Sequence, residues 1–523
     1  MFFQKDVHFQ MDISQFFNLS CRTTRCMMAT LSLVIAFGSS KCWPSIESNV
    51  EENRPNFIFI LTDDQTYHSI NTLGNNSIET PNLDRLAVNG MSFTHVFNQG
   101  SWSVAVCAPS RAMIHTGRHL FRTGFGKKHA QAKLIEFPLL GEVLQLHGYE
   151  TFITGKWHLE EGRKRNPEAL KKSFSFGSKI YQPYSSNKGE GVHFAPLVAE
   201  YTESSARLTP PFVFSTTTHS TTLLTDAALD YLTEKRKRNN QPFFLYLSFL
   251  APHDPHQSPK QFEQFYSKRK IQLPENFRPK HPFDQGDWTV RDEVLLPFPR
   301  VPAQIKENLL KYYAMITHLD FEIGRLMNFL NTSKYAKNTY VIFTSDNGLA
   351  SGQHGLLGKQ NQYDHSVRVP FIIKGPTVQK NVRKTGMFYI NSVFPTILEL
   401  AGLPVPDTVD AKSIVSLIEN DDEQSYEFIY GGYKHFQRMV RSKRYKLIHY
   451  PVIQKTQLFD LYSDPFEINS IENNPESGEL IDDLFLELER LKVLVGDPLR
   501  NDDPIGSFSD FFRGTQGIKL SEL

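Results

Sequence analysis

The stretch Asn56-Phe57-Ile58-Phe59-Ile60-Leu61 decides the fold, and Thr62, Asp63 and Asp64 follow it directly. Its apolar residues stand at successive positions, which is typical of a strand buried on both faces of a sheet. Ligands of open α/β sheets bind beyond the carboxyl ends of the strands. The two carboxylates therefore stand where a binding site is expected.

Four more apolar runs of this kind predict buried parallel strands, and segments with apolar residues at i, i+3 and i+4 spacing predict helices between them. This alternation predicts a doubly wound α/β fold with helices on both faces of a mostly parallel sheet. The strands are expected at residues 149–154, 242–249, 339–344 and 370–374, and the helices at 81–90, 138–148, 224–238 and 304–330.

Polar residues also follow three of the other predicted strands. They are Gly-Lys-Trp-His at 155–158, Pro-His-Asp-Pro-His at 252–256 and Asp-Asn-Gly at 346–348. Because the carboxyl ends of parallel strands meet at one edge of the sheet, four strand ends are expected to converge on one site.

The last hundred residues differ in pattern from the rest. Segments at 427–430, 437–441, 445–450 and 457–462 predict a small antiparallel sheet, and residues 481–495 predict a helix. A chain of 523 residues exceeds what one core usually holds. We therefore expect a large catalytic domain at residues 53–410 and a smaller α+β subdomain at residues 411–523.

The first 40 residues are predicted to be a signal peptide. Residues 26–37 form an apolar run that basic residues precede and small residues follow, and the run is too short to span a bilayer. A buried helix is the alternative interpretation. The signal predicts export to a secreted, periplasmic or lysosomal location, without stable membrane insertion.

Composition excludes other classes of protein. The formal net charge of +1 gives no global attraction to polyanions, so no nucleic-acid partner is expected. Of the four cysteines, Cys21 and Cys26 would leave with the signal, and Cys42 and Cys107 would remain. Two cysteines make no disulfide framework.

Cys107 opens the run CAPSRAMIHTGR at residues 107–118. A single cysteine in an apolar context is more often a small buried hydrophobe. The pattern Cys-x-Pro-Ser-Arg, four residues and Thr-Gly, however, resembles the signature of the type I sulfatases of the alkaline-phosphatase-like superfamily. The resemblance implies that a formylglycine-generating or equivalent enzyme oxidises Cys107 to formylglycine (3-oxoalanine), the catalytic aldehyde.

The resemblance extends from about Pro55 to Pro475. The stretch SGQHGLLGKQN at residues 351–361 is similar to that of sulfatases near the iduronate and choline sulfatase groups. Asn391 replaces the usual aspartate before Phe-Pro-Thr, and Ala411 replaces the usual glycine after Asp410. Neither change falls in the catalytic set.

A metal site is predicted from the carboxylates. Asp63 and Asp64 would repel each other unless a cation or donor array lay between them, and a hard cation suits them. Asp346 and Asn347 offer further oxygen ligands, and the resemblance places all four, with the side chain derived from Cys107, around one Ca²⁺. Alternatively, the aspartates cap a helix and Asn347 opens a tight turn.

A sulfate ester also needs compensating cations, for which Arg111, Lys156 and Lys359 are candidates. Surface lysines are the alternative. His158 and His253 titrate near neutrality, as acid and base groups must. The resemblance implies that a hydroxyl of hydrated formylglycine attacks sulfur, His253 protonates the leaving alcohol, and His158 accepts the proton that allows sulfate to leave.

Other polar groups stay ambiguous. His256 and His354 could bind substrate or simply pack. The basic runs at 235–238 and 163–165 could guide a sulfated polymer, although such runs are usually solvated faces.

The prediction is a sulfatase that acts on sulfate esters, in particular those of sulfated carbohydrates or glycosaminoglycans. A phosphate or phosphonate ester hydrolase on the same scaffold is the alternative enzyme. A sulfated-glycan-binding protein without activity is the alternative outside enzymes.

Overall fold

The computed structural model describes residues 54–124, 134–159, 168–181, 192–201, 212–213, 218–236, 240–420 and 426–499. The predicted signal peptide, with Cys21 and Cys26, lies outside the described residues, as do Cys42 and the basic run at 163–165. Among the described helices, none has both the length and the apolar character needed to cross a bilayer.

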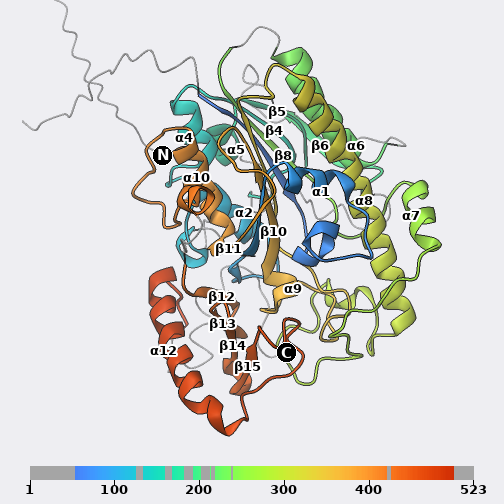
Figure 1. Cartoon of the computed structure of the whole chain (residues 1–523), viewed down its shortest axis with the longest axis vertical. Helices are drawn as coiled ribbons and strands as arrows, with labels where there is room; N and C mark the ends of the chain where they lie inside the picture. The colour runs from blue at the N-terminus through green and yellow to red at the C-terminus, as the bar shows by residue number, and fades with distance from the viewer. Residues whose placement is uncertain are drawn as a thin grey trace, which may run out of the picture. The chain divides into compact units, whose positions relative to one another are not determined.

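A ten-stranded sheet forms the centre of the fold, in the order β11-β2-β10-β9-β1-β8-β4-β5-β6-β7 (Figure 1). The block β9-β1-β8-β4-β5 is parallel throughout, which confirms the mostly parallel sheet. The strands are β1 (Asn56–Thr62), β2 (Met91–Phe97), β4 (Glu150–Lys156), β5 (Phe176–Tyr181), β6 (Leu197–Tyr201), β7 (Phe212–Val213), β8 (Phe243–Ser248), β9 (Thr339–Ser345), β10 (Arg368–Lys374) and β11 (Val382–Tyr389).

The strand at residues 370–374, here β10, was predicted to be parallel to its neighbours, and this prediction was wrong. This strand lies antiparallel to both of its neighbours, β9 and β2. Its connection from β9 contains only the short helix α9 (Asp364–Val367), so no helix carries the chain back across the sheet. A parallel return needs such a crossover. The apolar run of a strand buried on both faces does not reveal strand direction.

Helices cover both faces of the large sheet, as predicted. Along β1, Phe57 and Phe59 pack in one core cluster, whereas Ile58 and Ile60 pack in another. Successive strand residues point to opposite faces, so each cluster fills one side. The first cluster includes residues of α2, α4 and α10, and the second includes residues of α1, α6 and α8, which lie on opposite sides of the sheet in Figure 1.

The helices on the first side are α2 (Cys107–Thr116), α4 (Leu140–Leu146), α5 (Glu168–Ser173), α10 (Val393–Leu400) and α11 (Val415–Glu419). Those on the second side are α1 (Pro81–Val88), α6 (Ser220–Asp230), α7 (Lys260–Ser267) and α8 (Pro302–Thr332). A π-helical turn, Tyr231–Lys235, continues α6.

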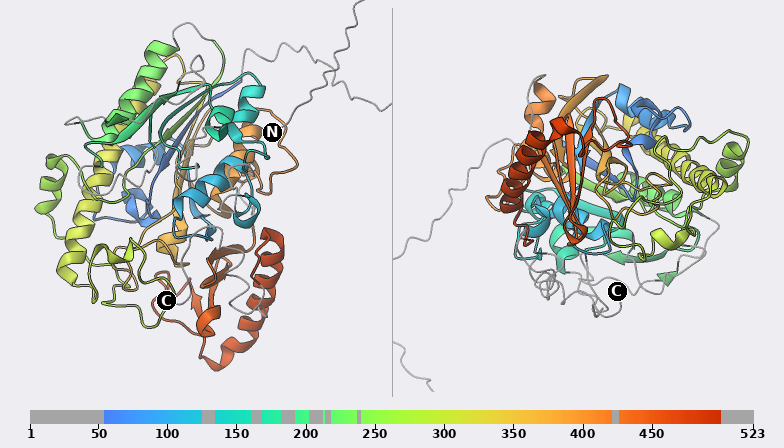
Figure 2. Two further views of the ribbon diagram at one scale, coloured as in Figure 1. Left: turned by 180° about the vertical axis from the view of Figure 1, so that it is seen from behind. Right: turned by 90° about the horizontal axis from the view of Figure 1, so that it is seen from below.

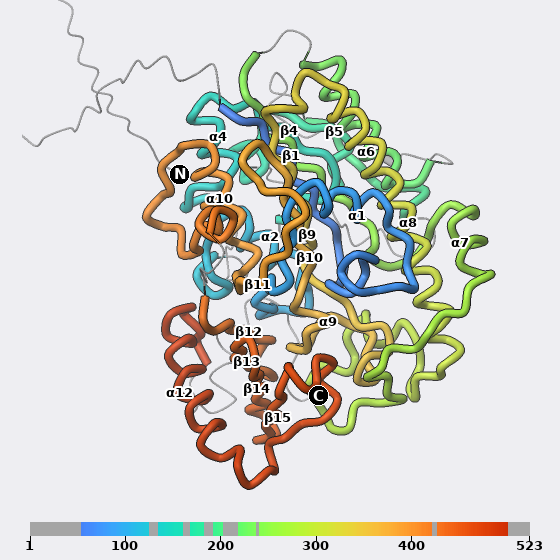
Figure 3. The backbone as a smooth tube through the Cα atoms, in the orientation of Figure 1, coloured from blue at the N-terminus to red at the C-terminus, as the bar shows by residue number. Residues whose placement is uncertain are grey.

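The predicted antiparallel sheet is also present, in the order β15-β14-β13-β12-β3. Figure 3 labels β12 to β15, and Figure 2 shows this part of the fold from two further sides. Its strands are β12 (Ile429–Tyr433), β13 (Gln437–Arg441), β14 (Tyr445–Tyr450) and β15 (Lys455–Asp460), and α12 (Gly478–Val495) lies beside them. The domain boundaries at residues 40, 53 and 410 stay predictions.

One edge of the small sheet comes from far upstream. β3 (Gly100–Ser101) pairs in parallel with Gly432 and Tyr433 of β12. A Cβ at Gly100 would lie 2.2 Å from the carbonyl oxygen of Gly432, so only glycine permits this approach. The pairing ties the small sheet to the segment that leads into Cys107.

Candidate active site

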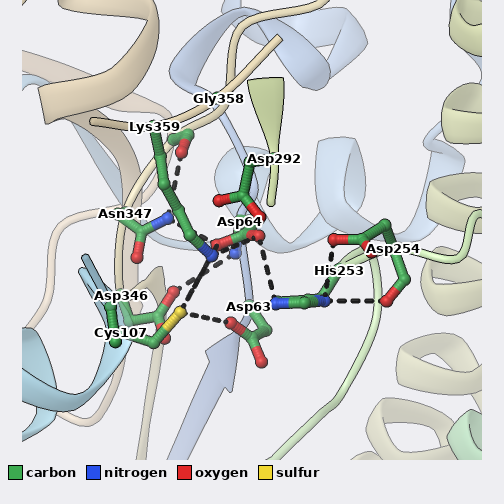
Figure 4. Close-up of polar contacts among 12 residues, drawn as sticks. Asp63, Asp64, Cys107, His253, Asp254, Asp292, Asp346, Asn347, Gly358 and Lys359 are labelled. Atoms are coloured by element: carbon green, nitrogen blue, oxygen red, sulfur yellow. Dashed lines mark hydrogen bonds and ion pairs between the residues drawn. The ribbon is translucent and has the colours of Figure 1, made fainter. Parts of the chain in front are cut away.

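Cys107 is the first residue of α2, a helix that the sequence analysis did not predict. Two local signals could have revealed it: Pro109 stands in the first turn, and Gly117 ends the helix with a left-handed φ of 65°. The helix N-terminus presents the cysteine side chain to the carboxyl ends of β1 and β9. Figure 4 shows Asp63 after β1, His253 after β8 and Asp346 after β9 close together. Lys156 at the end of β4 contacts Asp63, so the predicted convergence of four strand ends is present.

The Cys107 thiol is buried among charged groups. Its Sγ lies 3.2 Å from Oδ1 of Asp63 and 3.6 Å from Oδ1 of Asp64, and Lys359 Nζ donates to it at 3.1 Å. Burial and the Asp63 carboxylate raise the pKa of this thiol well above its usual range. Catalytic cysteines have a lowered pKa, so these surroundings do not activate Cys107 as a thiolate.

Three buried cations pair with three buried carboxylates. Lys156 contacts Asp63, and Lys359 Nζ lies 2.6 Å from both carboxylate oxygens of Asp64. The side chains of these lysines are only 4% and 3% exposed, which excludes the surface-lysine alternative. The third pair is Arg111 with Asp346, whose Oδ2 lies 3.0 Å from the guanidinium.

These pairs shift the pKa values of the site. Burial alone would raise the pKa of Asp63, but Lys156, His253 and Arg111 hold it well below its usual range. Burial would lower the pKa of Lys359, but Asp64 raises it. Burial and the charge of Asp63 raise the pKa of Asp346 to about 6. Additional positive charge near Asp346 would favour the ionised form of this carboxyl group.

Three of the predicted metal ligands, Asp63, Asp64 and Cys107, gather in one place with His253, which was not predicted as a ligand. The ligand atoms of Asp63, Asp64, Cys107 and His253 all lie within 4.8 Å of one another. Asn347 Nδ2 donates to Asp64 Oδ1 at 2.6 Å, whereas its buried Oδ1 finds no donor among the described residues. A buried amide oxygen without a donor beside carboxylates is suited to a cation such as Ca²⁺.

Asp346 differs from the other predicted ligands in what it contacts. Its Oδ1 accepts the backbone N–H of Asp64 at 3.2 Å, while Oδ2 faces Arg111. Tyr246 and Ser248 of β8 hold Arg111 from the other side, with Ser248 Oγ at 2.6 Å. Sequence reasoning missed these two residues because they lie within an apolar strand.

His253 has a defined orientation. Its Nδ1 lies 2.8 Å from the backbone oxygen of Asp254 and 3.2 Å from the Asp254 carboxylate. Both partners are acceptors, so Nδ1 carries a hydrogen and a further proton goes to Nε2. Nε2 lies 3.7 Å from Asp64 Oδ2, at the metal-ligand cluster. Asp254 belongs to the motif at residues 252–256, but only the structure shows that it orients His253.

Two buried histidines hold the loop that carries His253. His193 Nε2 lies 3.0 Å from the carbonyl oxygen of His253, and His219 Nε2 lies 2.9 Å from that of Gln257. Because the backbone N–H of Thr221 donates to His219 Nδ1, the hydrogen of this ring is on Nε2. Burial lowers the pKa of both histidines, to about 4 for His193. Both therefore act as neutral donors.

His158 follows β4 in a left-handed conformation, with φ of 58°. Gly155 makes this strand end possible, because a Cβ there would lie 1.8 Å from the Ser248 carbonyl oxygen. Burial and the charge of Lys156 lower the pKa of His158 well below its usual range. Its ring is therefore neutral, as a proton acceptor must be.

The histidines that the sequence left ambiguous pack against neighbouring side chains. His256 Nδ1 lies 3.1 Å from Asn308 Oδ1 and its ring packs on Tyr312, while the His354 ring stacks on Tyr363 with centroids 3.8 Å apart. In the basic run, Arg236 is buried and pairs with Glu150 at 2.5 Å. Lys237 and Arg238 lie outside the described residues.

Two charged residues beside His253 were not predicted. Asp292 is buried and accepts a hydrogen bond from Gln360 Nε2 at 2.8 Å, and Arg291 contacts both Asp254 and Asp292. They belong to the long segment between α7 and α8, and no motif marks them.

Comparison with known proteins gives matches along most of the chain. Residues 55–403 match the sulfatase family, and residues 352–493 match the family described as N-sulphoglucosamine sulphohydrolase, C-terminal. An ulvan-active sulfatase of Formosa agariphila is 27% identical, over 90% of this chain and 88% of that protein. Human iduronate 2-sulfatase is 27% identical, over 72% of this chain and 73% of that protein.

Solved structures share the fold. A protein crystallised with its substrate D-glucosamine-2-N,6-O-disulfate has a TM-score of 0.70 and 22% identity, over 86% of this chain and all of that one. The phosphonate monoester hydrolase of Agrobacterium radiobacter has a TM-score of 0.64 and 20% identity, over 84% of this chain and 96% of that one.

Proposed function

The chain belongs to the sulfatase family of sulfuric ester hydrolases, and we propose that it hydrolyses sulfate esters of glycans with a formylglycine made from Cys107 and a bound Ca²⁺. The observation that carries the proposal is the environment of Cys107, whose Sγ contacts Asp63, Asp64 and Lys359 within 3.6 Å. A thiol packed for stability alone would have apolar neighbours.

The formylglycine and the calcium ion would each supply one part of the chemistry. Hydrated formylglycine at position 107 would provide the hydroxyl that attacks sulfur, and Ca²⁺ held by Asp63, Asp64, Asp346 and Asn347 would withdraw charge from the sulfate oxygens.

The chain's own residues have separate roles. Lys156 and Lys359 would stabilise negative charge that develops on the sulfate, while Arg111 holds Asp346 in place. His253 would donate the proton on Nε2 to the leaving oxygen, with Nδ1 held by Asp254. His158 would accept the remaining hydroxyl proton of the residue at position 107, so that sulfate leaves and the aldehyde is restored.

The glycan substrate class is supported by relatives with 25–27% identity. They include the ulvan-active sulfatase and an N-acetylglucosamine-6-O-sulfatase of Bacteroides thetaiotaomicron. We further propose that the protein is exported, which the pattern at residues 26–37 supports. N-terminal sequencing of the mature protein tests the export proposal, which predicts that residues 1–40 are absent.

Two measurements test the proposed chemistry. Mass spectrometry of the peptide containing Cys107 should show the aldehyde when the protein is made with a formylglycine-generating enzyme. Nitrophenyl sulfate and nitrophenyl phosphate should then be compared side by side. Preference for the sulfate supports the proposal, and preference for the phosphate would favour the phosphoryl alternative that shares this fold. An unmodified Cys107 in an active enzyme would contradict the mechanism.

A further inference from the structure

Arg291 is a solvent-exposed neighbour of His253, the proposed general acid. Its Nη2 is 3.5 Å from His253 Nε2, the nitrogen that would protonate the leaving group. The Arg291 side chain is 57% exposed, unlike the buried cations Arg111, Lys156 and Lys359. A leaving group that contacts His253 therefore lies beside an accessible guanidinium.

The guanidinium is held in a fixed position but has a free edge. Nη2 lies 2.7 Å from Asp254 Oδ1 and 2.5 Å from Asp292 Oδ1, and Nε donates to Asp292 Oδ1 at 2.9 Å. Nη1 has no hydrogen-bond or ion-pair partner among the described residues. Because two carboxylates already orient the side chain, a ligand at Nη1 binds with little further loss of side-chain entropy.

Asp254 and Asp292 do not fully neutralise the positive charge of Arg291, because each carboxylate also interacts with other polar groups. Asp292 accepts from Gln360 Nε2 at 2.8 Å, and its pKa is lowered by the charge of Lys359 as well as that of Arg291, despite burial. The Asp254 carboxylate lies 3.2 Å from His253 Nδ1.

We propose that Arg291 Nη1 binds an anionic group, a carboxylate or a second sulfate, carried by the leaving sugar next to the scissile ester. The inference rests on the proposed function and adds a substrate preference to it. A guanidinium pairs with either anion through directed, charge-assisted hydrogen bonds. The enzyme then prefers sulfated sugars that carry a second negative charge.

Steady-state kinetics of Arg291→Met and Arg291→Lys test this inference on four substrates. They are a sulfated uronic acid, a disulfated hexosamine, a hexosamine with one sulfate, and nitrophenyl sulfate. Arg444→Met is the matched control, because Arg444 is 51% exposed and pairs with Asp460 at 3.0 Å in the small sheet. This control should match the wild type on every substrate.

Loss of a charge-assisted hydrogen bond predicts that Arg291→Met lowers kcat/KM about 10- to 100-fold on the substrate with the recognised anion. Most of the loss should appear in KM, and Arg291→Lys should recover part of it. Losses on the two substrates without a second anion should stay below about threefold. If kcat/KM falls on the sulfated uronic acid, the recognised anion is a carboxylate. If it falls on the disulfated hexosamine, the recognised anion is a sulfate.

Two kinetic results would overturn the inference. Equal losses on all four substrates would mean that Arg291 only positions Asp254 and His253. A wild-type enzyme without preference for either doubly charged substrate would also exclude recognition.

Failure of the proposed function gives a different result, because the wild type would then hydrolyse none of the four esters. Calorimetry with a Cys107→Ala protein separates the two outcomes. Its affinity for the preferred charged sugar should fall about tenfold or more when Arg291→Met is added. An unchanged affinity would refute the role of Arg291 independently of catalysis.

Discussion

Replacing His253 with alanine is expected to slow the hydrolysis of a sugar sulfate far more than that of nitrophenyl sulfate. A sugar alkoxide needs a proton as it leaves, whereas a nitrophenolate scarcely does. In the structure, Asp254 holds Nδ1 at 2.8 Å and Nε2 faces the metal-ligand cluster. The variant removes the one ring nitrogen placed to deliver that proton without removing any of the three buried cations.

The size of the effect follows from this orientation. A positioned general acid contributes about 10²- to 10⁴-fold, or about 3 to 5.5 kcal/mol of the barrier at 1.36 kcal/mol per tenfold. We therefore expect kcat to fall by that factor on the sugar sulfate. On nitrophenyl sulfate the fall should be less than about tenfold.

The assay compares kcat and kcat/KM on both substrates, with thermal unfolding to confirm that the variant is folded. His256→Ala is the matched control, because His256 lies in the same loop but bonds Asn308 and packs on Tyr312. It should affect both substrates equally. Equal losses for His253→Ala would refute the general-acid role and direct attention to Lys359.

Three further predictions concern the nucleophile, the metal and the scaffold. Cys107→Ser and Cys107→Ala should abolish turnover and leave the fold intact, because neither side chain regenerates an aldehyde; wild-type turnover by the alanine variant would refute the proposed function. Chelation should remove one Ca²⁺ per chain and lower both activity and thermal stability, and calcium should restore both; the absence of any metal by elemental analysis would contradict the site. Asp320→Ala should lower the unfolding free energy by about 1–3 kcal/mol. The reason is that Asp320 Oδ1 accepts the backbone N–H of Asn82 at 3.0 Å and of Leu83 at 2.7 Å at the start of α1. Denaturant unfolding measures the change, and a variant as stable as the wild type would exclude this role.

Asp63, Asp64, Lys156, Asp346 and the loop of His253 could be placed in one site from the sequence. Each follows an apolar strand, and in a parallel sheet the ends of such strands meet at one edge. The signature at residues 107–118 added Cys107 and Arg111. These predictions depend on local pattern and on the geometry of one sheet, so no knowledge of loop shape was needed.

The tertiary structure alone decided the direction of β10, the pairing of β3 with β12, and the surroundings of His253. Arg291 lies 38 positions after His253, and nothing in its local sequence indicates which groups it will meet. Local sequence encodes burial and periodicity, because these act on neighbouring residues. Strand direction and contacts between loops depend instead on how the whole chain closes and packs, so they emerge only when the fold is complete.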